Sequence, residues 1–164
     1  MWFKFLCFGI FQYYSWYYKT ENQMYFDLMN FKFPIKENSE RKEKVYAIDF
    51  DNTIVYTNYP TILKPLPYAV EVLRVLTKDP YSTLILWTCR EGDDLKEALN
   101  FCDICGIKFD YVNENCKRNL NLYKVDCRKV SADVYIDDHS YQGIEGVEKL
   151  WHDWYLWMKD KRMI

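Results

Sequence analysis

The sequence of 164 residues predicts an α/β domain, a three-layer Rossmann-like parallel sheet. Two observations support this fold class. Short, continuous apolar runs recur along the chain, as in strands that are covered on both faces. These runs alternate with segments whose apolar residues repeat at helical spacing. Strand, helix and strand in alternation favour right-handed crossovers and a mostly parallel sheet. The length is that of one domain.

Four segments are predicted to be strands, and three longer segments are predicted to be helices. The strands are 45–50, 82–87, 109–112 and 133–136. The first helix follows the prolines of segment 60–68 and has an inner face of Ala69, Val70, Leu73 and Leu76. Asp93 is predicted to cap the second helix, and Gly106 to end it. The last helix carries a stripe of Val147, Leu150, Trp151, Trp154, Tyr155 and Met158.

The first 44 residues are predicted to be separate from this domain, which would then span 45–164. Residues 1–33 contain 14 of the 31 aromatic side chains, without a regular period. A run of mixed charges, 36–44, follows as a solvated linker. Three interpretations stay open: a loosely ordered extension, including one from an initiator methionine placed too far upstream; an anchor at a membrane interface; or an additional packing segment.

Composition excludes several functions. The net charge of −2 provides no electrostatic reason for a nucleic-acid or membrane partner. The five glycines form neither a dinucleotide-binding nor a P-loop motif. Two histidines and the lack of a GxSxG motif disfavour a serine hydrolase and a histidine-rich zinc site. Association with a second copy of the chain is left open.

The six cysteines are typical of a reduced, cytoplasmic protein, because no convincing export signal accompanies them. Cys102 and Cys105 form a CxxC pair, but they fall on or beside the predicted buried stripe of the second helix. A second close pair, which zinc ribbons use, is missing. We therefore expect these cysteines to pack in the core rather than to bind zinc.

Polar residues gather directly after three of the predicted strands. Asp49 and Asp51 lie at the end of the first strand, and Thr88 and Arg90 follow the second. Asp137 and Asp138 follow the last. Ligands of open parallel sheets bind beyond the carboxyl ends of the strands, so we expect one site there. Segments 60–68 and 113–128 are expected to be irregular and to form its walls.

The charge of these residues indicates their chemistry. Up to four carboxylates would converge, and they cannot all stay ionised without a cation. Mg²⁺ is the usual choice where a phosphate completes the shell of oxygen ligands. Thr88 can donate to a phosphoryl oxygen, and Arg90 and Lys129 can offset negative charge. Arg90 is alternatively a partner of Glu91 or Asp138. The pattern favours phosphoryl transfer.

At this point the chain resembles the haloacid dehalogenase-like (HAD) phosphohydrolases. Residues 48–55, IDFDNTIV, resemble their DxDxT motif. Their second motif is resembled by Thr88 with the two residues before it, their third by Lys129, and their fourth by 135–138. The motifs occur in the family's order. Lys124 is an alternative to Lys129. Asn52 stands where the family usually has glycine, and asparagine tolerates left-handed backbone.

The resemblance covers about 45–142 and implies a set of roles. Asp49 would be the nucleophile that becomes an aspartyl-phosphate, and Asp51 the general acid and base. Mg²⁺ would be held by Asp49, the backbone carbonyl of Asp51 and Asp137, with Asp138 a ligand or the partner of a bound water. Thr53 would steady the loop and, with Thr88 and Arg90, contact the phosphate.

The gaps between the motifs are too short to contain a further domain. In this the chain resembles the capless branch of the family, which has a HAD-like fold without a cap domain. The sequence therefore predicts a Mg²⁺-dependent phosphatase whose phosphorylated substrate belongs to an unknown class. Two alternatives are a receiver-like signalling module and a HAD-like scaffold that binds phosphate without turnover. The order of the motifs, with Asp-x-Asp at the end of the first strand, disfavours a receiver-like module.

Overall fold

The computed structural model describes residues 42–164, and Glu43–Ile164 form one compact unit. The predicted extension, 1–44, lies almost wholly outside the described residues. The three interpretations of its aromatic segment therefore stay predictions.

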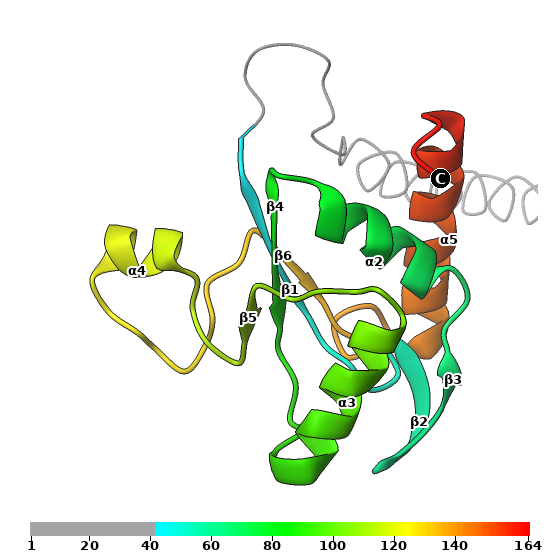
Figure 1. Cartoon of the computed structure of the whole chain (residues 1–164), viewed down its shortest axis with the longest axis horizontal. Helices are drawn as coiled ribbons and strands as arrows, with labels where there is room; N and C mark the ends of the chain where they lie inside the picture. The colour runs from blue at the N-terminus through cyan, green and yellow to red at the C-terminus, as the bar shows by residue number, and fades with distance from the viewer. Residues whose placement is uncertain (1–41) are drawn as a thin grey trace, which may run out of the picture. The chain divides into compact units, whose positions relative to one another are not determined.

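The core of this unit is a four-stranded sheet in which every pairing is parallel (Figure 1). Its strands in spatial order are β5 (Tyr111–Val112), β4 (Ser82–Leu86), β1 (Lys44–Ile48) and β6 (Val134–Ile136). β1 is thus a central strand, and it is buried almost throughout, as its apolar run predicts. The predicted α/β class with a three-layer Rossmann-like sheet is confirmed.

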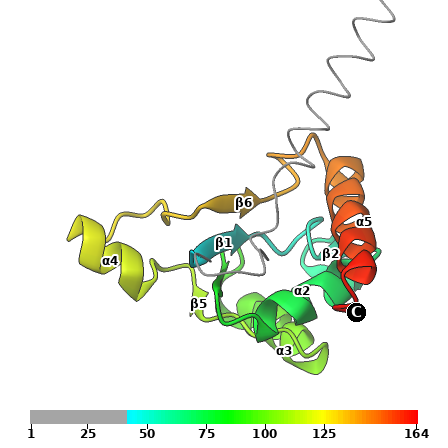
Figure 2. The same cartoon turned by 90° about the horizontal axis from the view of Figure 1, so that it is seen from above.

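Helices and loops cover both faces of the sheet, which makes the three layers. On one face the ring of Tyr46 meets Trp154 of α5 (Ile144–Asp160) edge-on, at 6.2 Å between centroids. On the other, Val45 and Ala47 pack with residues of the segment that follows β5. Figure 2 shows α2, α3 and α5 on one side of the sheet and α4 on the other.

The two helices on the chain between β1 and β5 agree with the sequence pattern except in detail. In α2 (Ala69–Lys78) the buried residues are Ala69, Val72, Leu73 and Leu76. Val72, not Val70, therefore completes the inner face. α3 (Gly92–Ile104) begins after Glu91, and Asp93 lies in its first turn without a capping hydrogen bond. The predicted cap is wrong, whereas Gly106 follows the helix with a positive φ of 72°, as a terminating glycine does.

Both segments expected to be irregular contain regular structure. Residues after Asp49 form an antiparallel hairpin of β2 (Val55–Asn58) and β3 (Thr61–Pro65). The segment after β5 contains α4 (Lys117–Tyr123). β3 is largely exposed and carries a proline at its end, so it lacks the apolar alternation by which a strand is recognised. Within the described residues, no helix is both long and apolar enough to cross a membrane.

Candidate functional site

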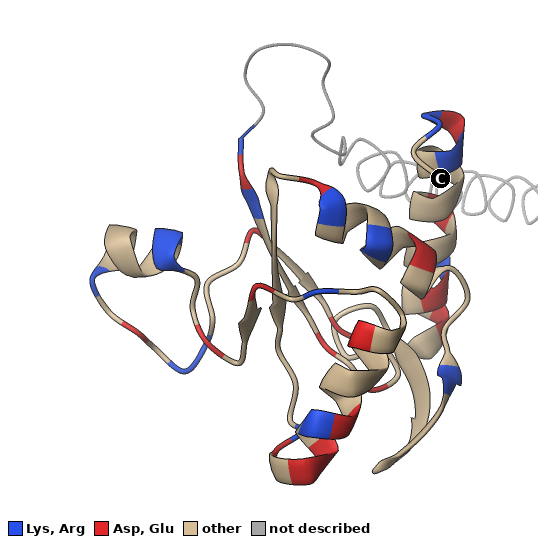
Figure 3. Ribbon diagram, in the orientation of Figure 1, with Lys and Arg blue, Asp and Glu red and all other residues tan. Residues whose placement is uncertain are grey.

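The carboxyl ends of β1, β4 and β6 lie level, because their last residues are paired. Ile48 is in register with Leu86 on one side and Ile136 on the other. The residues that follow these strands therefore meet at one edge of the sheet. In Figure 3 acidic residues occur in the loops at this edge, below the sheet.

Asp49 begins a tight loop that turns back under the sheet edge. Its backbone N–H donates to the carbonyl of Ile136 at 2.9 Å, which attaches it to β6. The N–H of Ile54 then closes the turn by donating to the carbonyl of Phe50 at 2.9 Å. Asn52 lies in this turn with a φ of 53°, a left-handed conformation that asparagine tolerates better than most residues. Its side chain accepts a hydrogen bond from the N–H of Thr57 at 3.3 Å.

Thr53 links the first and last polar clusters. Its hydroxyl donates to a carboxylate oxygen of Asp49 at 3.4 Å and accepts from the backbone N–H of Asp138 at 3.0 Å. Thr53 is fully buried, and its carbonyl accepts a hydrogen bond from the indole N–H of Trp151 at 2.7 Å. These bonds fit the predicted role of Thr53 in steadying the loop; its predicted contact with phosphate stays a prediction. The role of Trp151 could not be found from the sequence, where it stands out only as a core residue.

The carboxyl group of Asp49 is electrostatically strained. Its pKa is raised from 3.8 to about 7, mainly by burial, against a lowering contribution from the N–H of Phe50. The nearby charges of Asp137, Asp51 and Asp138 contribute to the same rise. Among the described residues, no cationic side chain is a named cause of the shift. Near neutral pH an ionised Asp49 is therefore costly until a positive charge arrives.

This strain predicts a stability change. Because the pKa of Asp49 is higher in the folded than in the unfolded chain, the folded state binds the extra proton between about pH 4 and 7. Stability is then lost as pH rises through that window. In EDTA at pH 8, Asp49→Asn should be more stable than the unaltered chain, by up to roughly 4 kcal/mol at about 1.4 kcal/mol per pKa unit.

Urea unfolding of both proteins from pH 4.5 to 8 measures this difference, which should shrink towards the acid end. Asp103→Asn, at an exposed position of α3, is the matched control and should follow the unaltered chain. Equal stability of Asp49→Asn and the unaltered chain at pH 8 would contradict a free-energy cost of ionised Asp49 in the folded state.

Asp137 and Asp138 end β6 in a turn. A carboxylate oxygen of each accepts from the backbone N–H of His139 at 2.9 Å. The imidazole of His139 is exposed and lies 3.8 Å from Asp138. Both carboxylates lie near the loop of Asp49, where they contribute to its raised pKa.

Thr88 is held by a residue that the sequence did not reveal. Asn113, just past β5, accepts from the backbone N–H of Thr88 at 2.8 Å and donates to its carbonyl at 2.9 Å. This amide continues the sheet pairing beyond the strands. The Thr88 hydroxyl accepts from the N–H of Arg90 at 3.2 Å, so its own proton can still be donated. A polar residue directly after the short strand was the available signal for Asn113.

Arg90 has a partner that the sequence did not predict. It is fully buried, and its Nε and Nη2 donate to the two carboxylate oxygens of Asp51 at 2.9 and 2.8 Å. The alternative partners that the sequence offered were Glu91 and Asp138, and neither forms this pair. The predicted contact of Arg90 with a substrate phosphate stays a prediction.

Both candidate lysines are exposed. Lys129 is exposed, with its ammonium 5.5 Å from the ring centroid of Tyr135. Lys124 is the exposed residue that ends α4. Neither lysine contributes to the pKa shift of Asp49. Lys129 as the catalytic lysine, and Lys124 as its alternative, stay predictions.

The donor set at this edge suits a hard cation. In the described part of the chain no three acidic, histidine or cysteine side chains are arranged to hold a metal ion by themselves. Asp51 is neutralised by Arg90, whereas burial and like charges raise the pKa of Asp49. Mg²⁺ accepts one or two carboxylates with water and substrate oxygens completing its shell, and this site offers those carboxylates.

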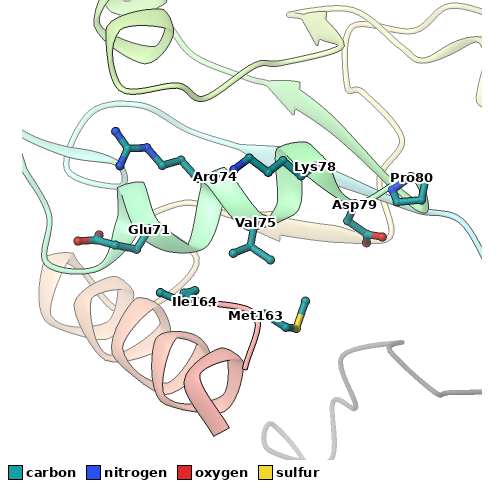
Figure 4. Close-up of a pocket in the computed structure, with 8 residues that line it drawn as sticks. All are labelled: Glu71, Arg74, Val75, Lys78, Asp79, Pro80, Met163 and Ile164. Carbon is teal, nitrogen blue, oxygen red and sulfur yellow. The ribbon is translucent and has the colours of Figure 1, made fainter. Parts of the chain in front are cut away.

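A separate hollow of about 550 Å³ opens between α2 and the C-terminal residues Met163 and Ile164 (Figure 4). Its other lining residues are Glu71, Arg74, Val75, Lys78, Asp79 and Pro80. None of them belongs to the cluster around Asp49. The hollow is therefore not part of the candidate site.

Comparison with known proteins yields one informative similarity. No family model and no curated protein matches the chain. A solved structure described as a conserved protein coded by a locus of Bacteroides thetaiotaomicron is 33% identical, with a TM-score of 0.56. The alignment covers 74% of this chain and 93% of that protein. With this identity over nearly the whole of the relative, the chain belongs to the same family as the conserved Bacteroides protein.

Proposed function

We propose that this chain is a Mg²⁺-dependent phosphatase of the HAD type that works through an aspartyl-phosphate on Asp49. One observation carries the proposal: a buried threonine hydroxyl joins Asp49 to the backbone of Asp138, so the first and last motifs form one constellation. The raised pKa of Asp49 adds support, because perturbed carboxyls cluster at functional sites.

The proposed reaction has two steps. In the first, a carboxylate oxygen of Asp49 attacks phosphorus, and the bond to the leaving oxygen breaks with its electron pair. In the second, water attacks the same phosphorus while Asp51 takes its proton, and the electron pair of the P–O bond returns to Asp49. Inorganic phosphate leaves, and the proton passes to solvent. Thr88 would donate a hydrogen bond to a phosphoryl oxygen in both steps.

Asp49, Asp137 and the backbone carbonyl of Asp51 would hold Mg²⁺, with Asp138 as a further ligand or the partner of a bound water. The cation supplies positive charge that lets an anionic phosphate approach a cluster of carboxylates. Thr53 keeps Asp49 and the Asp138 backbone in register, and Lys129 is retained as the candidate for compensating further charge.

The proposed site would be open. Between Asp49 and α2 the chain contributes the short β2–β3 hairpin, and between β5 and β6 it contributes α4. Elements of this size are consistent with the capless branch, in which bulky phosphorylated substrates can reach the nucleophile. An open site admits several classes of substrate and selects none of them.

The direct test is phosphate release from p-nitrophenyl phosphate. The full-length chain should release nitrophenolate with Mg²⁺, lose this activity in EDTA, and regain it when Mg²⁺ is restored. Binding of phosphate without turnover, under the same conditions, would instead favour the non-catalytic scaffold. Turnover that is indifferent to EDTA would contradict the proposed cation.

A further inference from the structure

The pair of Arg90 and Asp51 is the most completely enclosed ion pair in the described residues. No part of the Arg90 side chain is exposed, and about a quarter of the Asp51 side chain is. The two parallel hydrogen bonds, at 2.9 and 2.8 Å, join residues 39 positions apart. A planar guanidinium makes such a fork with a carboxylate in one orientation, which specifies the direction of both side chains.

Arg90 is itself held by groups other than Asp51. Its Nη2 also donates to the carbonyl of Pro60 at 2.8 Å, and its Nη1 to the carbonyl of Asp94 at 3.4 Å. The rings of Phe50 and Tyr59 lie 5.0 and 5.4 Å from its central carbon. The hairpin tip, the start of α3 and the loop after β1 thus determine where the guanidinium lies before Asp51 is considered.

We propose that Arg90 is a positioning residue for Asp51, and that it does not bind the substrate phosphate. Its scaffold partners orient the guanidinium, and the guanidinium aims the carboxylate that accepts the proton of the attacking water. The inference deepens the proposed function and rests on it. Arg90 would then matter for breakdown of the aspartyl-phosphate, not for its formation from a substrate with a good leaving group.

Rapid-quench kinetics of the full-length chain with p-nitrophenyl phosphate separates the two steps. Arg90→Lys keeps the charge but cannot form two parallel hydrogen bonds. It should retain the nitrophenolate burst and lower the steady-state rate by roughly 10- to 100-fold, the size expected when a catalytic group is misplaced by about 1 Å. Phosphorylated protein should accumulate. Arg118→Lys is the matched control, because Arg118 also pairs with a carboxylate, Asp133 at 2.9 Å, outside the motifs; its kinetics should be unchanged.

Two further variants distinguish positioning from general damage. Arg90→Ala should regain steady-state turnover when guanidinium ion is added at millimolar concentration. In Arg90→Ala combined with Asp51→Asn, guanidinium should have no effect, and the double variant should be no slower than Asp51→Asn alone. If Arg90→Ala does not fold, Arg90→Lys and its combination with Asp51→Asn provide the same test of additivity.

The outcomes are distinct. A lost burst and a raised KM in Arg90→Lys, with normal breakdown of the phosphorylated protein, would mean that Arg90 binds phosphate and would overturn the inference. Unchanged kinetics in a folded variant would also overturn it. If the unaltered chain forms no phosphorylated protein and releases no phosphate, the proposed function fails, and this inference fails with it.

Discussion

Asp49→Asn should abolish phosphate release and leave no phosphorylated protein, because the amide lacks the carboxylate oxygen that attacks phosphorus. Removal of the covalent nucleophile lowers turnover by roughly 10⁶-fold in a well-studied hydrolase. The loss should occur without damage to the fold. Asparagine has nearly the same shape and can still accept from the hydroxyl of Thr53. It also removes the cost of ionising a carboxyl group whose pKa is raised to about 7, mainly by burial.

The measurement is nitrophenolate release with Mg²⁺, together with intact mass spectrometry of acid-quenched samples. Asp103→Asn again serves as the control, since it makes the same chemical change at an exposed position outside the site. Substantial turnover by a pure, folded Asp49→Asn protein would remove Asp49 as the nucleophile.

Asp51→Asn should behave differently, by trapping the intermediate. Nitrophenolate leaves without needing a proton, so the first step should proceed in this variant. Breakdown of the aspartyl-phosphate would lack its base and slow by about 10²- to 10⁴-fold, the typical contribution of general base catalysis. A burst of nitrophenolate should therefore be observed, followed by accumulation of phosphorylated protein.

Quenched-flow measurement of the burst, with mass spectrometry for the phosphoryl group, decides this prediction. Because Asp51→Asn leaves the buried Arg90 without its anionic partner, the folded state of the variant should be checked by circular dichroism. A folded Asp51→Asn protein that binds Mg²⁺ but forms no phosphorylated species would show that Asp51 is needed in the first step as well.

The sequence by itself determined the parts of this protein that depend on neighbours along the chain. Strand β1 is recognisable because it is buried on both faces and therefore almost wholly apolar. The polar residues that follow such strands are confined to one edge, so the sequence alone places Asp49 and Asp138 near each other. Asn52 and Gly106 are similar cases, since a positive φ restricts the residue at its own position.

Only the tertiary structure decided which polar groups are partners. Asp51 and Arg90 are 39 positions apart, and Thr88 and Asn113 are 25 apart. The sequence offered Glu91 and Asp138 as acidic partners of Arg90. In the structure Arg90 instead pairs with Asp51, and it also donates to the carbonyl of Pro60 at the tip of the β2–β3 hairpin. That hairpin left little trace in the sequence, because β3 is mostly exposed and has no buried face to impose a pattern.

The sequence indicated an acidic site but did not show which acid pairs with Arg90, for the same physical reason. Burial of apolar surface leaves a sequence pattern in the buried strands and amphipathic helices, so the scaffold and the carboxyl-terminal edge of its sheet can be predicted from local sequence. A hydrogen-bonded pair leaves no periodic pattern in the sequence, where only the types of its two residues can be seen. Its geometry depends on loops brought together by the whole fold, and for Arg90 those loops enclosed the guanidinium and directed it to Asp51.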